Sequence, residues 1–257
     1  MYLRYIYTHV NRSSPVEYTK AQDKNWSFNT NFISDFFCTN VRKLKIEVAD
    51  FNFLSVEICK LPKLRVQRLD YSKSLSVYIP FSQSEMDALT SITNFPERME
   101  AYLSLYEQGF YIANEYCNIQ VDKLLALSQI FRETGYRYEW LFKKKLIREY
   151  NIYVLFRCFF TSIDFTLKLE VYNINQPILL TSGIVFQTAP DRIFFHKEFN
   201  KGIRIESDKM YLLDFLDKPN FEFDLKKLSN GIFNVKRLQK DIDTSTLIEE
   251  INWLKQV

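Results

Sequence analysis

Hydrophobic and polar residues alternate with a period of two along many short stretches of the chain, a pattern typical of strands with one buried face. In residues 163–171 every second side chain is apolar, and the hydrophilic residues between them are Asp, Thr, Lys and Glu. The same reading predicts strands at residues 1–10, 41–48, 53–59, 63–69, 74–81, 152–160, 163–172, 178–188, 192–199, 202–206 and 209–215. Weaker strand patterns occupy 221–225 and 232–238, and the polar stretch 11–31 predicts a loop.

Helical spacing replaces this alternation in the middle of the chain. Ser84 followed by Asp87 is a capping pattern for a short first helix, and Pro96 suits the first turn of a longer helix over 96–117. A third helix is predicted at 120–134, ending at Gly135. Residues 137–150 also favour a helix, and an amphipathic helix is expected at 246–255.

Blocks of strands separated by a block of helices indicate an α+β fold. We expect antiparallel β-sheets that flank a central helical segment, with a helix at the C-terminal end. The chain has 257 residues, of which 47% are hydrophobic, so it can bury a large core. We predict one compact unit with tentative lobes at 1–150 and 151–257.

Several catalytic classes lack their motifs here. The chain has 5 glycines, and they are scattered along it. Neither of the glycine-rich motifs that bind nucleotide phosphates, G-x-G-x-x-G and G-x-x-x-x-G-K-[ST], is present. It has 2 histidines, His9 and His196, and none of the histidine-containing metal motifs or serine nucleophile motifs. We therefore expect no enzyme activity, no cofactor and no bound metal.

The cysteines and the apolar segments bear on the compartment. Cys38, Cys59, Cys117 and Cys158 are too far apart for a metal or redox motif, and reduced thiols in a cytoplasm are the expectation. The first ten residues lack the apolar region of a signal peptide. The most apolar stretch, 152–171, contains four charged residues and does not suit a membrane span. The sequence predicts a soluble cytoplasmic protein that does not bind membranes.

One face of the predicted helix 96–117 is acidic. Residues 85–135 hold eight acidic and three basic side chains, although the whole chain has a net charge of +3. The face is formed by Glu97, Glu100, Glu107, Tyr111 and Glu115. A solvated surface would explain it, and a docking face for a basic protein is the functional alternative, with carboxylates that accelerate encounter and Tyr111 as an anchor.

Residues 42–73 have an excess of positive charge, with eight basic and four acidic side chains. Lys43 with Lys45, and Lys63 with Arg65, are predicted to share strand faces. Lysines of this kind guard sheet edges against aggregation, and a nucleic-acid surface is the functional alternative. Stacking of bases would require aromatic side chains among the cations, and Tyr71 and Tyr78 are the candidates.

Acidic residues near a predicted hairpin suggest a third possibility, a metal-dependent hydrolase. Asp191, Glu206, Asp208 and Lys209 lie near one another in the sequence. Glu206 and Lys209 are three positions apart and would face opposite sides of a strand, so a turn before the next strand is the simpler explanation.

In style, the chain resembles the immunity proteins of bacterial polymorphic-toxin systems, such as contact-dependent or type VI systems. The resemblance comes from the tyrosine-rich opening MYLRYIYTHV, the helical run ERMEAYLSLYEQGFYIANEY and the later series of short strands. It implies a non-catalytic cytosolic protein that binds one cognate toxin and occludes its active site. This is the leading hypothesis, ahead of nucleic-acid binding and hydrolysis.

Overall fold

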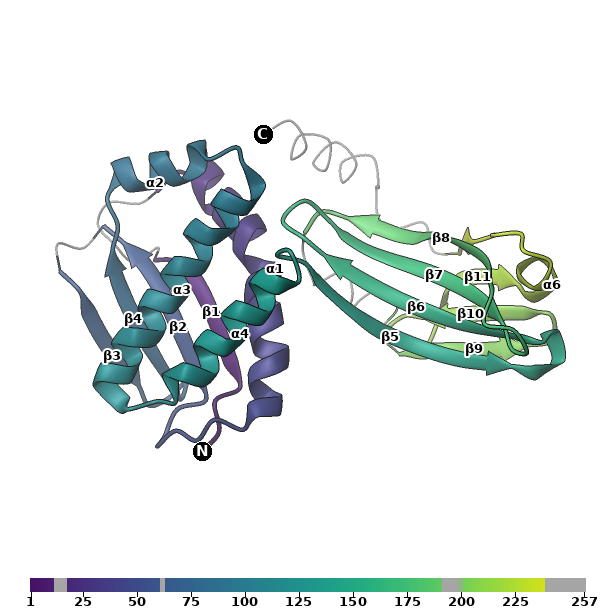
Figure 1. Ribbon diagram of the computed structural model, residues 1–257, viewed down its shortest axis with the longest axis horizontal. Helices are drawn as coiled ribbons and strands as arrows, with labels where there is room; N and C mark the ends of the chain where they lie inside the picture. The colour runs from purple at the N-terminus through teal and green to yellow at the C-terminus, as the bar shows by residue number, and fades with distance from the viewer. Residues whose placement is uncertain (12–17, 61–62, 191–198, 200, 239–257) are drawn as a thin grey trace. The chain divides into compact units, whose positions relative to one another are not determined.

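The computed structural model describes residues 1–11, 18–60, 63–190, 199 and 201–238. Helices and strands occur in similar proportion, which confirms the α+β prediction. The chain divides into two compact units, Met1–Tyr138 and Glu139–Val257, each shown in Figure 1.

The first unit contains a sheet of four strands in the order β1-β2-β4-β3. β1 (Tyr5–Val10), β2 (Phe53–Cys59) and β4 (Ser74–Pro80) run parallel to one another, and β3 (Arg65–Leu69) is antiparallel to β4. The antiparallel β3 makes this sheet mixed. β1 and β2 are parallel because a helical crossover after β1 returns the chain to the same end of the sheet.

That crossover, α1 (Lys20–Leu44), corrects two predictions. The loop expected at 11–31 and the strand expected at 41–48 are wrong, since both overlap this helix. Thr19 and Gln22 form a reciprocal capping box at its start, and Lys45 ends it in the left-handed conformation. The helix buries polar as well as apolar side chains, which interrupts its hydrophobic period: Asn29, Thr30, Ser34 and Asp35.

The central helical segment is confirmed as α2 (Gln83–Ser91), α3 (Phe95–Cys117) and α4 (Val121–Glu133). α2 is capped by Ser82, two residues before the predicted cap, whereas Pro96 lies in the first turn of α3 as expected. In Figure 1, α3 and α4 lie over one face of the sheet.

The helices bury the core of the first unit against the sheet. Tyr106 of α3 shares a hydrogen bond of 2.6 Å with the Ser34 hydroxyl of α1 and donates to the Thr30 carbonyl. Gly109 lets α3 approach β2, because a Cβ there would lie 2.4 Å from Val56 Cγ2. This face of the sheet is sealed, and the alternate side chains of each strand lie on the other face.

The second unit is built from two antiparallel sheets of four strands, ordered β5-β6-β7-β8 and β12-β11-β10-β9. Their strands and the short helix α6 are β5 (Tyr138–Ile147), β6 (Ile152–Phe160), β7 (Phe165–Asn173), β8 (Leu179–Thr188), β9 (Gly202–Glu206), β10 (Lys209–Leu213), β11 (Pro219–Asp224), α6 (Leu225–Ser229) and β12 (Lys236–Arg237). The rings of Phe156 and Phe223 meet between the sheets at 5.7 Å.

Two predictions about the second unit have different outcomes. The hairpin predicted at 152–172 is confirmed as β6 and β7, paired from Ile152 with Asn173 to Phe160 with Phe165. The helix predicted at 137–150 is wrong, because β5 occupies most of it and only Arg148–Tyr150 forms a turn of 3-10 helix. Pairing with β6 overrides the helical preference of its lysine-rich sequence.

Some predictions fall on parts of the chain that the structure does not describe. The predicted C-terminal helix at 246–255 and most of the strand at 192–199 lie outside the described residues. No helix within the described ranges is long and apolar enough to cross a membrane.

Candidate functional site

The acidic face of α3 is occupied in its middle by a cation from the next helix. Arg132 of α4 donates to Glu107 Oε1 at 2.7 Å and, through two nitrogens, to Glu100 at 2.8 and 3.0 Å. Tyr136 also donates to Glu100, at 2.5 Å. Glu100 and Glu107 are therefore half-buried partners in a helix–helix contact, and not members of a freely solvated acidic surface.

The charges and hydrogen bonds of this contact favour the ionised form of the Glu100 carboxylate. Burial alone would raise the pKa of Glu100, but the hydrogen bonds from Arg132 and Tyr136 outweigh it, so the pKa lies below its ordinary value. The pKa of Tyr136 rises to about 12 through burial and its bond to Glu100. The other members of the predicted docking face, Glu97, Tyr111 and Glu115, are exposed.

The structure separates the basic residues expected to share strand faces. Lys43 lies in the last turn of α1 and Lys45 is its C-cap residue, so neither is on a strand. Lys63 lies in a bend before β3 and is exposed. Only Arg65 is on a strand, where its guanidinium lies 5.7 Å from the centre of the Tyr78 ring.

The face of the first sheet opposite α3 carries a group of aromatic side chains that the sequence did not predict. Tyr5 and Tyr7 of β1 are in register with Phe53 and Ser55 of β2, and His9 is in register with Glu57. The remaining strand residues on this face are Cys59 of β2, Ser74, Ser76, Tyr78 and Pro80 of β4, and Arg65, Gln67 and Leu69 of β3. The alternation of Tyr5, Tyr7 and His9 with Ile6, Thr8 and Val10 was the available signal for this face.

Neighbouring rings on this face are stacked on one another. The Tyr7 ring lies 5.3 Å from that of Phe53, with 13° between their planes, and 5.9 Å from that of His9, with 10°. Tyr5 follows at 6.1 Å from Phe53. These four side chains line a hollow of about 330 Å³, which we call the aromatic face.

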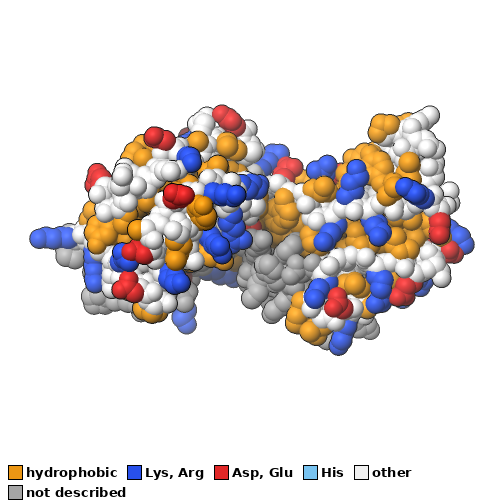
Figure 2. Space-filling view, turned by 90° about the horizontal axis from the view of Figure 1, so that it is seen from below, with side chains coloured by type: hydrophobic (Ala, Val, Ile, Leu, Met, Phe, Trp, Pro, Cys, Tyr) orange, Lys and Arg blue, Asp and Glu red, His pale blue; other side chains and the backbone are white. Residues whose placement is uncertain are grey.

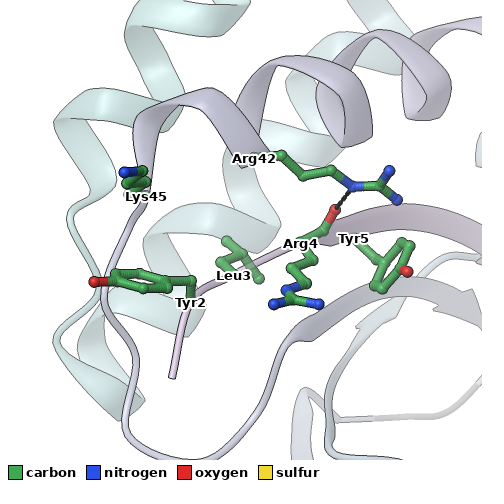
Figure 3. Close-up of a pocket in the computed structure, with 6 residues that line it drawn as sticks. All are labelled: Tyr2, Leu3, Arg4, Tyr5, Arg42 and Lys45. Carbon is green, nitrogen blue, oxygen red and sulfur yellow. Dashed lines mark hydrogen bonds between the residues drawn. The ribbon is translucent and has the colours of Figure 1, made fainter.

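A second hollow, of about 360 Å³, adjoins the aromatic face through Tyr5. It is lined by Tyr2, Leu3, Arg4, Tyr5, Arg42 and Lys45, which include three cations and no carboxylate. Figure 3 shows Arg42 reaching from α1 to the Arg4 carbonyl, with Nε donating at 3.2 Å. Its guanidinium lies 4.6 Å from the centre of the Tyr5 ring, within the range of a cation–π contact.

The cations around these hollows are spread out. In Figure 3 the side chains of Arg4, Arg42 and Lys45 point in different directions and do not converge on one point. Lys63 and Arg65 add positive charge where β3 begins. In the view of Figure 2, Lys and Arg side chains lie at several places on the first unit, with Asp and Glu side chains among them. This spacing suits a chain of anionic groups better than one small anion.

The residues considered for a hydrolase are engaged in separate ion pairs. Glu206 pairs with Arg204 at 2.8 Å, Asp208 with Lys226 at 2.5 Å, and Lys209 with Glu222 at 2.9 Å. Asp191 lies outside the described residues. Within the described part of the chain, no group of three His, Cys, Asp or Glu residues is placed to hold a metal. The four cysteines are free thiols, and Cys38, Cys59 and Cys158 are buried.

The comparisons with known proteins add no family to this description. No protein-family model, curated protein or solved structure matches the chain. The function must therefore be argued from the surfaces themselves.

Proposed function

We propose that the first unit binds single-stranded nucleic acid across the aromatic face of its sheet. The observation that carries the proposal is the row of Tyr5, Tyr7 and Phe53 on the sheet face opposite α3, with the Arg42 guanidinium over the Tyr5 ring. Proteins that bind single strands combine aromatic rings, on which bases stack, with cations that follow the backbone. On this face the aromatic rings come from β1 and β2.

The charges around the face support the same proposal. Arg4, Arg42 and Lys45 line the hollow beside Tyr5, and Lys63 and Arg65 lie near the start of β3. Separated cations can each contact one phosphate of an extended strand and release its counterions. With a net charge of +3 for the whole chain, we expect moderate affinity that depends strongly on salt.

The test is fluorescence anisotropy with labelled DNA and RNA strands of about nine nucleotides at several salt concentrations. Tyr7→Leu, which keeps apolar volume and removes the flat ring, should weaken binding about tenfold. Tyr111→Leu is the matched control, because Tyr111 is exposed on α3, away from this face. Absence of binding at low salt, or equal loss in both variants, would contradict the proposal.

Docking of a protein partner on α3 is the second candidate. It is favoured by the exposure of Tyr111 and Tyr116, at 53% and 59%, beside the exposed carboxylate of Glu115. Its specific form is an immunity protein that occludes the active site of a cognate toxin in the bacterial cytoplasm, without a cofactor or catalysis of its own.

This candidate is tested with the product of the neighbouring gene as the probe. Glu97→Lys combined with Glu115→Lys changes exposed side chains and should leave folding intact while slowing association. Unchanged association would remove α3 as the docking surface. Substitutions at Glu100 and Glu107 are unsuitable for this test, because they would also break the contact with Arg132.

A further inference from the structure

The edge strand β8 lacks the features that usually keep a strand from pairing with another chain. It forms one border of the sheet β5-β6-β7-β8 and is 10 residues long (Figure 1). Its sequence, LLTSGIVFQT, contains no charged residue and no proline. Edge strands in proteins are commonly short or carry charged side chains or proline, because their unpaired N–H and C=O groups otherwise pair with another strand.

The other edge strands of the described sheets are protected. β5, at the opposite border of the same sheet, carries three consecutive lysines at 143–145. β3, β9 and β12 each contain Arg or Lys. β1 contains neither, but the Cys38 thiol of α1 accepts from the Ile6 N–H at 3.3 Å and donates to the Ile6 carbonyl at 3.4 Å. β8 therefore differs from every other edge strand in the described sheets.

The outer edge of β8 has no backbone partner in the described part of the chain. All its strand pairing is with β7, and its backbone makes no hydrogen bond to a described residue outside that ladder. A Cβ at Gly231 would lie 3.2 Å from the Leu180 carbonyl oxygen, so the edge is flanked at that point. A Cβ at Gly183 would meet the Phe233 ring, which therefore packs on a face of β8 and not along its edge. The unpartnered edge begins at Thr181.

The side chains along this edge suit contact with a further strand. Ile184 is 53% exposed, and Ser182 lies on the same face two positions earlier. The ladder to β7 is interrupted at Leu180 and at Val185, so residues 181–184 form a regular stretch between two irregular positions. A strand paired beside this stretch would cover the exposed Ile184 side chain and complete the hydrogen bonding of the backbone.

We propose that the outer edge of β8 pairs with β8 of a second copy of the chain, antiparallel about a twofold axis. In such a pair the same strand faces itself. Because β8 carries no charge, the pairing places no like charges opposite one another, whereas self-pairing of the lysine-rich β5 would do so. Two four-stranded sheets then join into one sheet of eight strands. This interface lies on the second unit and does not depend on nucleic-acid binding by the first.

Sedimentation equilibrium of the full chain between about 1 and 100 μM, without nucleic acid, tests the pairing. The wild-type protein should form a dimer as concentration rises. Ile184→Lys places like charges near each other across the twofold axis and should raise the dimer dissociation constant about tenfold. Leu141→Lys is the matched control, because Leu141 is 47% exposed on β5, at the other border of the sheet, and should leave the constant unchanged. A monomer at every concentration, or an unchanged constant in Ile184→Lys, would overturn the proposal.

Hydrogen exchange of the wild-type protein gives a second measurement that needs no variant. The outward amides of residues 181–188 should exchange several-fold more slowly at the higher concentration, since they become hydrogen-bonded across the twofold axis. The amides of β5 should exchange equally at both concentrations. Exchange in β8 that does not depend on concentration would contradict the pairing, and so would slowing confined to another strand.

Discussion

Arg132 Nη1 lies 2.7 Å from Glu107 Oε1, so a guanidinium of α4 neutralises a carboxylate on the outer side of α3. The two residues are 25 positions apart, and no helical spacing within either segment relates them. The same guanidinium also binds Glu100. Part of the acidic side of α3 therefore holds α3 and α4 together. Glu100 and Glu107 are engaged in this contact and are less suited to binding a partner.

The first prediction concerns that joint. Arg132→Met should lower the free energy of unfolding by about 1–3 kcal/mol, because it removes charge-assisted hydrogen bonds and leaves two carboxylates facing each other. Urea denaturation measures the change. Arg137→Met is the control, since Arg137 is exposed and should cost less than about 0.5 kcal/mol. Similar losses in both variants would mean that the contact contributes no net stability.

Acid should weaken the same joint. The pKa of Glu100 is held below its ordinary value, so the carboxylate contributes stability above its unfolded pKa and loses it as pH falls through the lower folded pKa. Glu170, bonded to Arg157 and Tyr172, has a pKa lowered in the same way and acts in the same direction. The free energy of unfolding should therefore fall on acidification below about pH 5, and less steeply in Arg132→Met than in the wild type. Denaturation curves between neutral pH and about pH 3 test this, and parallel curves would contradict it.

Gly109 offers a test of the packing of α3 against β2. Gly109→Ala places a Cβ 2.4 Å from Val56 Cγ2, so α3 must move away from β2, at a cost of about 1–3 kcal/mol in unfolding free energy. Val56→Ala removes the obstruction. In that background the same substitution should cost less or stabilise, because alanine is the better helix former. A double-mutant cycle measures the coupling, and additive effects would refute this packing argument.

Salt dependence tests the cations beside the aromatic face. Each side chain that contacts a phosphate contributes close to one unit to the slope of log affinity against log salt. Arg42→Ala and Lys45→Ala should each reduce that slope by about one unit and weaken all sequences alike. Lys123→Ala on α4 provides the control. Slopes that stay the same in the Arg42 and Lys45 variants would place the phosphate contacts elsewhere.

The sequence predicted an element correctly where that element has a single clear hydrophobic period or capping signal. The hairpin of β6 and β7 and the start of α3 at Pro96 follow from alternation and from helix-start signals. α1 was missed because it buries polar side chains such as Asn29 and Ser34 among its apolar ones. Asn29 donates to Asn25 within the helix, and Ser34 bonds to Tyr106 of α3. β5 was read as a helix because pairing with a neighbouring strand, and not local preference, decides its structure.

The residues of the candidate site also come together through contacts between elements that local patterns do not predict. For the nucleic-acid hypothesis, the sequence offered Tyr71 and Tyr78 as the aromatic side chains among the cations of residues 42–73. The structure brings Tyr5 and Tyr7 beside Phe53, across 46 residues or more of chain, through the parallel pairing of β1 with β2.

By itself, the sequence determined the α+β class, the central helices and most of the strands, because local periodicity and capping depend on residues a few positions apart. Only the tertiary structure decided which side chains share a surface. It paired Arg132 with two carboxylates of α3 and aligned Tyr5, Tyr7, Phe53 and Glu57 on one face. Strand order and helix packing join residues far apart in the chain, and no local pattern of hydrophobic and polar positions records those contacts.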